Sequence, residues 1–448
     1  MTAAGPRPLM AAVLRSRLYP GVLQWATAAV FVLVGYELLA GPRAAHDNLG
    51  TALTWVVWWP VIPVVFVLVG RFWCAICPFG TLSDAVQRLV GVHRPVPRFL
   101  RRYGIWVIDA QFIAITWADH VWGIVASPWG TGVLLLLLTT AVVASGAFFQ
   151  RRTFCRHLCF LGGLSGNYAR TGMVALRADQ AICATCTARA ACYHGGPAAP
   201  ACPLFEFPRT MDSAANCNLC ANCVKNCPND ALTLTVRPPT TELWTVRKPV
   251  PEHAFLAAAI MGIVFIQNIT MLGVWTDTLA WVARTTGLSS IPIVFTLAFT
   301  VAIAAPTLLL AAASWVAARR GAETTWRTFA RFGYALIPLD IAGHLAHNLF
   351  HLLAEGKAVL ITASALVGAG HAGGSTALVS GSTIRLIQYG VLAAGIAGSG
   401  YTVWRISRAR YGAWSGTLRA VLIPNLVLLT VLSAVNVVLF AMPMTMRM

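Results

Sequence analysis

The most informative stretch of the sequence is Cys217-Asn218-Leu219-Cys220-Ala221-Asn222-Cys223-Val224-Lys225-Asn226-Cys227-Pro228. Its four cysteines are separated by two, two and three residues, and a proline follows the last. This is the bacterial ferredoxin spacing, in which three thiolates bind one 4Fe-4S cluster and the fourth binds a second cluster. Four cysteines that merely packed as small hydrophobic residues would not need this spacing.

A stretched version of the same pattern lies upstream, in Cys183-x2-Cys186-x5-Cys192 followed by Cys202-Pro203. Crossed ligation of two 4Fe-4S clusters then predicts two ligand sets. The first set is Cys183, Cys186, Cys192 and Cys227, and the second is Cys202, Cys217, Cys220 and Cys223. A zinc ribbon is the competing interpretation, because Cys-x2-Cys pairs also bind zinc. The third cysteine two residues on and the trailing Cys-Pro of both halves favour iron and sulfur.

The rest of the chain has the composition of a membrane protein. Of its 448 residues 57% are hydrophobic and only 11% are charged, which is too little polar surface for a soluble cytoplasmic enzyme. Apolar stretches of about 20 residues, the length that a bilayer requires, recur along it. The nine predicted spans are 22–40, 51–69, 103–121, 131–149, 253–272, 291–317, 332–353, 384–403 and 421–440.

The net charge of +18 is explained by membrane topology rather than by nucleic-acid binding. The 33 basic residues lie between the apolar stretches and not in one patch. With the N-terminus inside, all of them fall on cytoplasmic segments except Arg43, Arg284, Lys357, Arg385 and Arg447. The sequence therefore predicts a protein of a prokaryotic-type cytoplasmic membrane, with the N-terminus and the cysteine-rich segment cytoplasmic and the C-terminus outside.

These patterns predict an all-α polytopic membrane protein of about nine transmembrane helices, with an inserted small α+β two-cluster ferredoxin-like domain. The N-terminal membrane region of two helical hairpins covers 1–149, and its second paired-cysteine turn extends to about 162. The cytoplasmic iron-sulfur domain covers 150–252, and a C-terminal membrane region of about five helices covers 253–448.

An internal repeat links the hairpins. Spans one and two lead into a turn with Cys74 and Cys77-Pro78, and spans three and four lead into a turn with Cys155 and Cys159. These four cysteines are expected at the same membrane depth, where they could surround a third iron-sulfur cluster or another metal. The alternatives are a redox-active dithiol at Cys74 and Cys77, or buried cysteines that only pack.

Over about residues 50 to 235 the chain resembles the membrane polyferredoxins typified by NapH, NosR and CcoG. The resemblance is carried by Cys74 with Cys77-Pro78, by Cys155 with Cys159, and by the eight ferredoxin cysteines. It implies electron transfer from membrane quinol to periplasmic reductases, or a role in metal-centre maturation. The first pair has two intervening residues where the family usually has three, and further spans follow the ferredoxin segment.

A last candidate site lies in the seventh span, where Asp340, His344, His347 and His351 stand at offsets of 0, 4, 7 and 11. On a helix all four share one stripe about 60° wide. Such groups are costly in hydrocarbon, so the stripe predicts a haem or metal site, or a proton or quinol site. The alternative is that His351 and His347 reach the outer interface while Asp340 bonds to a neighbouring helix.

The sequence thus predicts a membrane-bound iron-sulfur electron-transfer protein, an oxidoreductase subunit resembling quinol dehydrogenases. It would relay electrons between the quinone pool, or a haem or metal site, and the cytoplasmic 4Fe-4S clusters. The alternative is a maturation or redox-sensing protein, for example a metal-ion reductase. The lipid bilayer, a redox partner protein and quinone are the expected partners.

Overall fold

The computed structural model describes residues 8–288, 290–366, 368 and 375–444. The chain is mostly helical, with two short antiparallel strand pairs. It divides into two compact units. The first comprises residues up to Leu33, Val64–Gln111 and Leu135–Arg247, and the second comprises Val34–Pro63, Phe112–Leu134 and the chain from Lys248 onward.

Within the described residues six helical segments are long and apolar enough to cross a membrane. They are α2 (Gly21–Ala40), the run Leu49–Val90, α8 (Pro128–Phe148), α15 (Pro251–Ile269), α17 (Ile291–Ala318) and α22 (Gly416–Ala441). A seventh is added if the bent pair Thr325–Glu355 and Ala358–Leu366 counts as one span. The chain is therefore an α-helical membrane protein.

The predicted number of nine spans stays a prediction. Predicted spans 103–121 and 384–403 lie within long helices, α7 (Arg98–Trp122) and α21 (Gly381–Tyr411). Neither helix is apolar enough to be counted among the candidate spans. Polar residues explain this, among them Asp109 and Gln111 in α7 and Gln388 in α21.

Four helices contribute residues to both compact units, namely α2, α4 (Trp59–Val69), α7 and α8. A division by sequence alone, into 1–149, 150–252 and 253–448, does not follow these compact units, because long helices are shared between them. The ferredoxin-like domain as an independent insertion stays a prediction.

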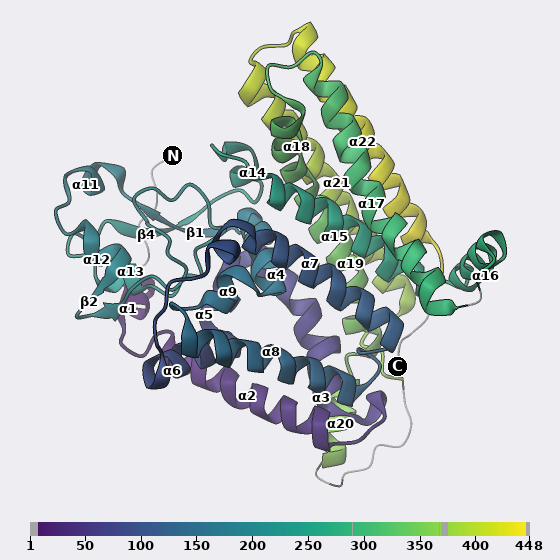
Figure 1. Cartoon of the computed structure of the whole chain (residues 1–448), viewed down its shortest axis with the longest axis horizontal. Helices are drawn as coiled ribbons and strands as arrows, with labels where there is room; N and C mark the ends of the chain where they lie inside the picture. The colour runs from purple at the N-terminus through teal and green to yellow at the C-terminus, as the bar shows by residue number, and fades with distance from the viewer. Residues whose placement is uncertain (1–7, 289, 367, 369–374, 445–448) are drawn as a thin grey trace. The chain divides into compact units, whose positions relative to one another are not determined.

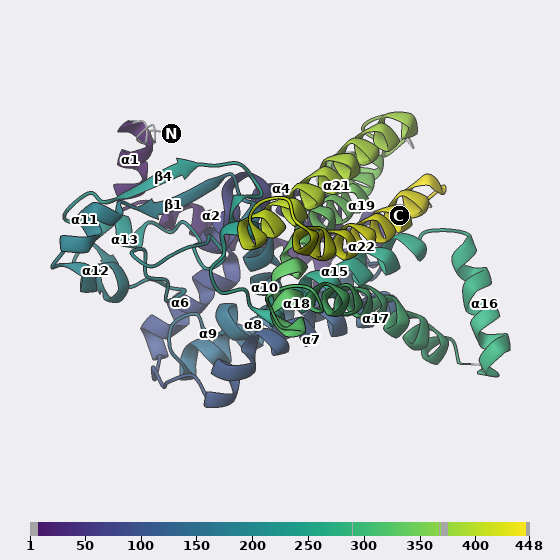
Figure 2. The ribbon, with the colours of Figure 1, turned by 90° about the horizontal axis from the view of Figure 1, so that it is seen from above.

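Among the described residues, the first unit contains all the strands. Strand β1 (Val174–Ala178) pairs antiparallel with β4 (Leu232–Val236), with Val174 opposite Val236 and Ala178 opposite Leu232; the two lie side by side in Figure 2. A two-residue pair joins β2 (Gly195–Gly196) and β3 (Ala199–Pro200). The short helices around them are α1 (Pro8–Arg15), α11 (Gln180–Thr185), α12 (Arg189–His194), α13 (Asn222–Lys225) and α14 (Thr241–Thr245).

The hydrophobic core beside this sheet is small. Its buried members are Leu14, Leu176, Met211, Leu219, Ala221, Val224 and Leu232, and three cysteines pack against it. A core of this size supplies little stability, so the segment is of the kind that gains its order from bound metal.

The second unit is a helical bundle of α15, α17, α18 (Thr325–Gly333), α19 (Ile337–Glu355), α21 and α22. Helices α17, α21 and α22 are its longest members, and α22 packs against both of the others (Figure 1). Small residues let the helices approach closely. A Cβ on Gly262 would lie 2.4 Å from the carbonyl oxygen of Ala302, and one on Gly395 would lie 2.2 Å from the Ala342 side chain. The remaining α-helices of this unit among the described residues are α3 (Leu49–Thr51), α16 (Val274–Thr286) and α20 (Ala358–Leu366).

Candidate iron-sulfur sites and the buried histidine stripe

The two paired-cysteine turns have the same local structure. In the first, Cys74 lies in α5 (Trp73–Ile76), and Cys77 is the residue before α6 (Pro78–Val90). In the second, Cys155 lies in α9 (Thr153–His157), and Cys159 is the residue before α10 (Phe160–Tyr168). Cys77 and Cys159 both have extended backbone, with ψ of 132° and 115°. The repeat seen in the sequence is therefore a repeat of a short helix, a bend and a second helix.

Each turn has a buried arginine three residues before its first cysteine. Arg71 Nε donates to Cys74 Sγ at 3.3 Å, and Arg71 Nη1 donates to the carbonyl oxygen of Ala215 at 2.8 Å. Arg152 Nη1 donates to the carbonyl oxygen of Cys74 at 2.8 Å. Both arginines are at most 5% exposed. Two cations are thus built in beside the thiols of the turns.

Arg152 also forms a bidentate ion pair with Asp84 of α6. Its Nε lies 3.1 Å from both carboxylate oxygens, and its Nη2 lies 2.6 Å from Oδ2. Burial opposes the charge of Arg152, but Asp84 more than offsets this and raises the pKa of the guanidinium. Gly80 makes room for the contact, since a Cβ there would lie 2.9 Å from Arg152 Nη1.

The four thiols of the turns interact electrostatically with one another. Burial raises the pKa of Cys155 to about 11, while Arg152 opposes the shift and Cys74 adds to it. Burial likewise raises the pKa of Cys159, and the neighbouring Cys155, Cys77 and Cys74 raise it further. The structure therefore brings Cys74, Cys77, Cys155 and Cys159 into one neighbourhood.

The first predicted ferredoxin set also comes together. One small cavity is lined by all four of its cysteines, Cys183, Cys186, Cys192 and Cys227. Arg189 and Arg209 are part of the same lining. Asn229 Nδ2 donates to Cys186 Sγ at 3.2 Å.

The second set lines a separate small cavity, with Cys202, Cys217, Cys220 and Cys223. Leu219 and Ala221 curve the loop between these cysteines, with positive φ angles of 58° and 62°. Such angles are strained for residues with a Cβ. The hydrophobic core holds them, since both side chains are buried in it. Burial raises the pKa of Cys217 to about 11 and that of Cys220 to about 12.

The three groups of cysteines lie near one another in the folded chain. Cys223 of the second set interacts electrostatically with Cys192 of the first. Arg152 interacts with Cys155 of the turns and with Cys220 of the second set. Asn218 Nδ2 also donates to the carbonyl oxygen of Cys74 at 3.4 Å. The second ferredoxin set is therefore near both the first set and the paired turns.

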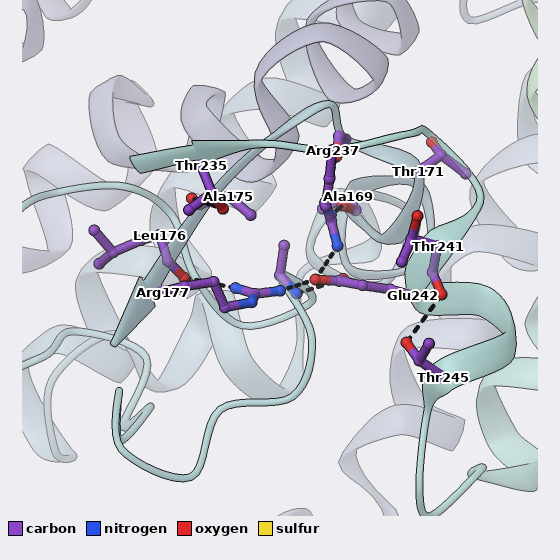
Figure 3. A network of polar contacts seen from close by, with 12 residues as sticks. Ala169, Thr171, Ala175, Leu176, Arg177, Thr235, Arg237, Thr241, Glu242 and Thr245 are labelled. Atoms are coloured by element: carbon purple, nitrogen blue, oxygen red, sulfur yellow. Dashed lines mark hydrogen bonds and ion pairs between the residues drawn. The ribbon is translucent and has the colours of Figure 1, made fainter. Parts of the chain in front are cut away.

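A buried acid secures the loop before Cys217. Figure 3 shows Glu242 of α14 between Arg177 of β1 and Arg237, and ion pairs join it to both. Its Oε2 accepts a hydrogen bond from the backbone N–H of Ala214 at 2.7 Å. Since Glu242 is 3% exposed, this network fixes the sheet, α14 and the loop in one arrangement.

The predicted stripe on α19 is fully buried in the second unit. Asp340, His344, His347 and His351 are each at most 5% exposed. His347 Nδ1 lies 3.2 Å from Asn268 Oδ1 of α15, and the His347 and His351 rings are 5.3 Å apart. The side chains of both histidines are buried among the described residues.

The stripe continues to a residue that the sequence analysis did not include. Glu355 is 2% exposed, and its Oε1 lies 3.3 Å from His351 Nδ1. At the other end, the His344 ring lies 5.5 Å from Trp59, which follows a π-helical segment, Ala52–Trp58. Among the described residues no three His, Cys, Asp or Glu side chains converge as the ligands of a single metal ion do.

Arg71, Arg152 and Asp84 are also absent from the sequence-based sites. The sequence could have pointed to the two arginines, because each stands at the same position of the repeat. The sequence does not indicate the pairing of Arg152 with Asp84, because the two residues are 68 positions apart.

A family model described as a 4Fe-4S binding domain matches the chain twice, over residues 51–97 and 131–176. Each matched region contains one paired-cysteine turn. No curated protein and no solved structure matches the chain. The match and the apolar helices support an iron-sulfur membrane protein of the ferredoxin type. The match covers the two turns, and the ferredoxin motif at 217–228 lies outside both matched regions.

Proposed function

We propose that this chain is a membrane-bound electron-transfer protein with three 4Fe-4S clusters in series. The observation that carries the proposal is the order of the cysteine groups, from the paired turns through the second ferredoxin set to the first. Bound clusters would supply one-electron chemistry at potentials between roughly −700 and +450 mV. The protein's own residues hold, separate and bury the three positions.

The ligands proposed for the ferredoxin clusters are the crossed sets. Cys183, Cys186, Cys192 and Cys227 would hold one, and Cys202, Cys217, Cys220 and Cys223 the other. Each set lines its own cavity, which supports this assignment. The third cysteine two residues on and the Cys-Pro that ends both halves favour iron and sulfur over zinc.

Cys74, Cys77, Cys155 and Cys159 are proposed as the ligands of the third cluster. The double family match on the turns supports iron and sulfur over a dithiol. Arg71 and Arg152 would offset the negative charge of a four-thiolate centre in a site of low dielectric constant. Metal analysis of purified protein tests this directly. About twelve irons per chain are expected, and about eight would remove the third cluster from the proposal.

The physiological role that we propose is exchange of electrons with the quinone pool and relay to a redox partner protein. The resemblance to NapH, NosR and CcoG supports this role, and so do the candidate membrane-spanning helices. The competing function is metal-centre maturation or redox sensing, which the same family includes. Turnover with quinol distinguishes these functions, because only the electron relay requires it.

A reduction experiment separates these functions. Membranes containing the protein are mixed with a reduced quinol analogue, and cluster reduction is followed by electron paramagnetic resonance. Reduction that depends on the quinol supports the respiratory role. If dithionite reduces the clusters and the quinol does not at any pH tested, the maturation or sensing role is favoured.

The topology of the proposal has the N-terminus and the segment 150–252 on the cytoplasmic side. The basic residues between the spans support this orientation. It can be tested by labelling cysteines introduced at Ser213 and at Ser380 in sealed vesicles of known orientation. Ser213 should react only when the cytoplasmic face is accessible, and Ser380 only from the other side.

For the stripe of α19 we propose a proton path in preference to a haem or metal site. Five titratable side chains, Asp340 to Glu355, extend over about 22 Å of one helix. Hydrogen-bonded carboxylates and imidazoles at such spacing can pass protons. His344→Ala and His347→Ala should slow quinol-driven cluster reduction and leave iron content unchanged. Haem absorbance, or a metal other than iron, in wild-type protein would replace this proposal with the haem or metal site.

A further inference from the structure

An open cavity of about 590 Å³ in the first compact unit has no place in the electron-transfer proposal. Its walls come from the junction of α1 and α2, from the end of α6, and from the segments 198–203 and 220–225. This volume is within the range of cavities that bind small organic ligands.

The cavity carries a strong excess of positive charge. Five cationic side chains line it, Arg17, Arg88, Arg151, Arg152 and Lys225, together with a single carboxylate, Asp84. Arg152 already engages that carboxylate in the bidentate ion pair described above. Four cations are therefore left without a counter-charge in the lining.

Three of these cations also have hydrogen-bonding capacity left over. Arg17 and Arg88 are exposed, and neither forms a hydrogen bond or ion pair with any part of the chain that the structure describes. Arg151 stacks its guanidinium 4.2 Å from the Phe205 ring, and its buried Nε has no hydrogen-bond partner among the described residues. Lys225 differs, because it donates to the carbonyl oxygen of Tyr19.

We propose that this cavity binds a phosphate-bearing anion. Guanidinium groups match phosphate oxygens in pairs, and several of them around one cavity favour this anion over a neutral ligand. Gly21, Gln24 and Trp25 of α2, a candidate membrane span, form one wall, so an anionic phospholipid headgroup can supply the phosphate. A free organic phosphate has the same chemistry. Cys220, a proposed cluster ligand, is part of the lining, so the test measures iron content together with binding.

The test uses the full-length protein, purified in neutral detergent, with its iron content measured in each sample. Native mass spectrometry counts bound phosphatidylglycerol, with phosphatidylcholine of the same acyl chains as the neutral competitor. Equilibrium dialysis measures binding of pyrophosphate, the soluble probe. The variant is Arg17→Gln/Arg88→Gln. The matched control is Arg98→Gln/Arg101→Gln, two exposed arginines of α7 outside the cavity.

At least one of the two probes, phosphatidylglycerol or pyrophosphate, should bind to wild type and to the control variant with the same affinity. The cavity variant should bind that probe at least about tenfold more weakly. Preference for the lipid identifies a headgroup as the source, and preference for pyrophosphate identifies a soluble phosphate. The proposal is overturned if neither probe binds better than phosphatidylcholine, or if the cavity variant binds like the control. Arg88→Lys should keep part of the affinity, which separates loss of charge from loss of fold. If the purified protein binds a probe but contains no iron, the anion site stands and only the cluster proposal is contradicted.

Discussion

Arg71 and Arg152 occupy equivalent positions of the internal repeat, and both reach the same residue, Cys74. Arg71 contacts its sulfur at 3.3 Å and Arg152 its carbonyl oxygen at 2.8 Å. The first turn thus receives cationic contacts from both repeats. Only Arg152 has its charge offset by a carboxylate, that of Asp84.

This difference makes Arg71 the main electrostatic control of the proposed turn-bound cluster. Replacing it in Arg71→Gln should lower the reduction potential, because a nearby cation stabilises the more negative reduced state. At about 5 Å and an effective dielectric constant of about 20 the interaction is about 3 kcal/mol, or up to about 140 mV for one electron. A redox titration followed by electron paramagnetic resonance measures the shift.

Arg71→Lys should restore much of the potential, since it keeps the charge. Arg101→Gln, on the exposed start of α7, should leave it unchanged. A potential that is the same in Arg71→Gln and in wild type would show that the arginine does not act on the cluster electrostatically.

Crossed ligation makes a sharp prediction for two cysteines only four residues apart. Cys227→Ser should remove the same signal as Cys183→Ser, and Cys223→Ser should remove the same signal as Cys202→Ser. Each variant should lose about four irons. The measurements are iron content and the paramagnetic spectrum of the reduced protein. Identical spectra for Cys223→Ser and Cys227→Ser, with both differing from Cys183→Ser, would contradict the crossed arrangement.

The second turn offers a matched pair of glycines. A Cβ at Gly162 would lie 2.6 Å from the carbonyl oxygen of Cys155, whereas one at Gly166 would meet nothing nearer than 3.5 Å. Gly162→Ala should therefore displace Cys155 or Cys159 and reduce iron from about twelve to about eight per chain. Gly166→Ala, in the same helix, should keep the wild-type iron content. Equal iron content in both variants would argue against a cluster at the turns.

Glu242 should be important for stability rather than for electron transfer. Glu242→Gln leaves Arg177 and Arg237 without their shared counter-charge and weakens the anchor of Ala214, so the free energy of unfolding should fall by about 3 kcal/mol. Chemical denaturation followed by loss of cluster absorbance measures it. The comparison variant is Asp230→Asn, which breaks an exposed ion pair with Arg15 and should cost less than about 1 kcal/mol. A similar loss in both would show that the buried network has no special role.

The sequence predicted well those features that depend on local spacing. Short motifs predicted the three cysteine groups, which stay predictions as ligand sets. Apolar runs predicted membrane helices, and six or seven candidate spans are found among the described residues. The stripe of α19 followed from helical periodicity, which also places Glu355 on the same face, four residues after His351, although the predicted stripe did not include it. Contacts between distant segments could not be found in this way, as with Arg152 and Asp84 or Glu242 and its arginines. The sequence also did not predict that two units share α2, α4, α7 and α8, because this depends on how the helices pack.

The two turns each contribute half of one proposed ligand set, and 84 residues of chain lie between Cys74 and Cys159. A nascent chain that has emerged only as far as α6 can offer just two of the four thiols. The set is complete only after α7 and α8 have been synthesised and the ribosome has passed residue 159. Iron could therefore occupy this position only after both helical hairpins have been synthesised, and a chain stalled before that point could not be loaded.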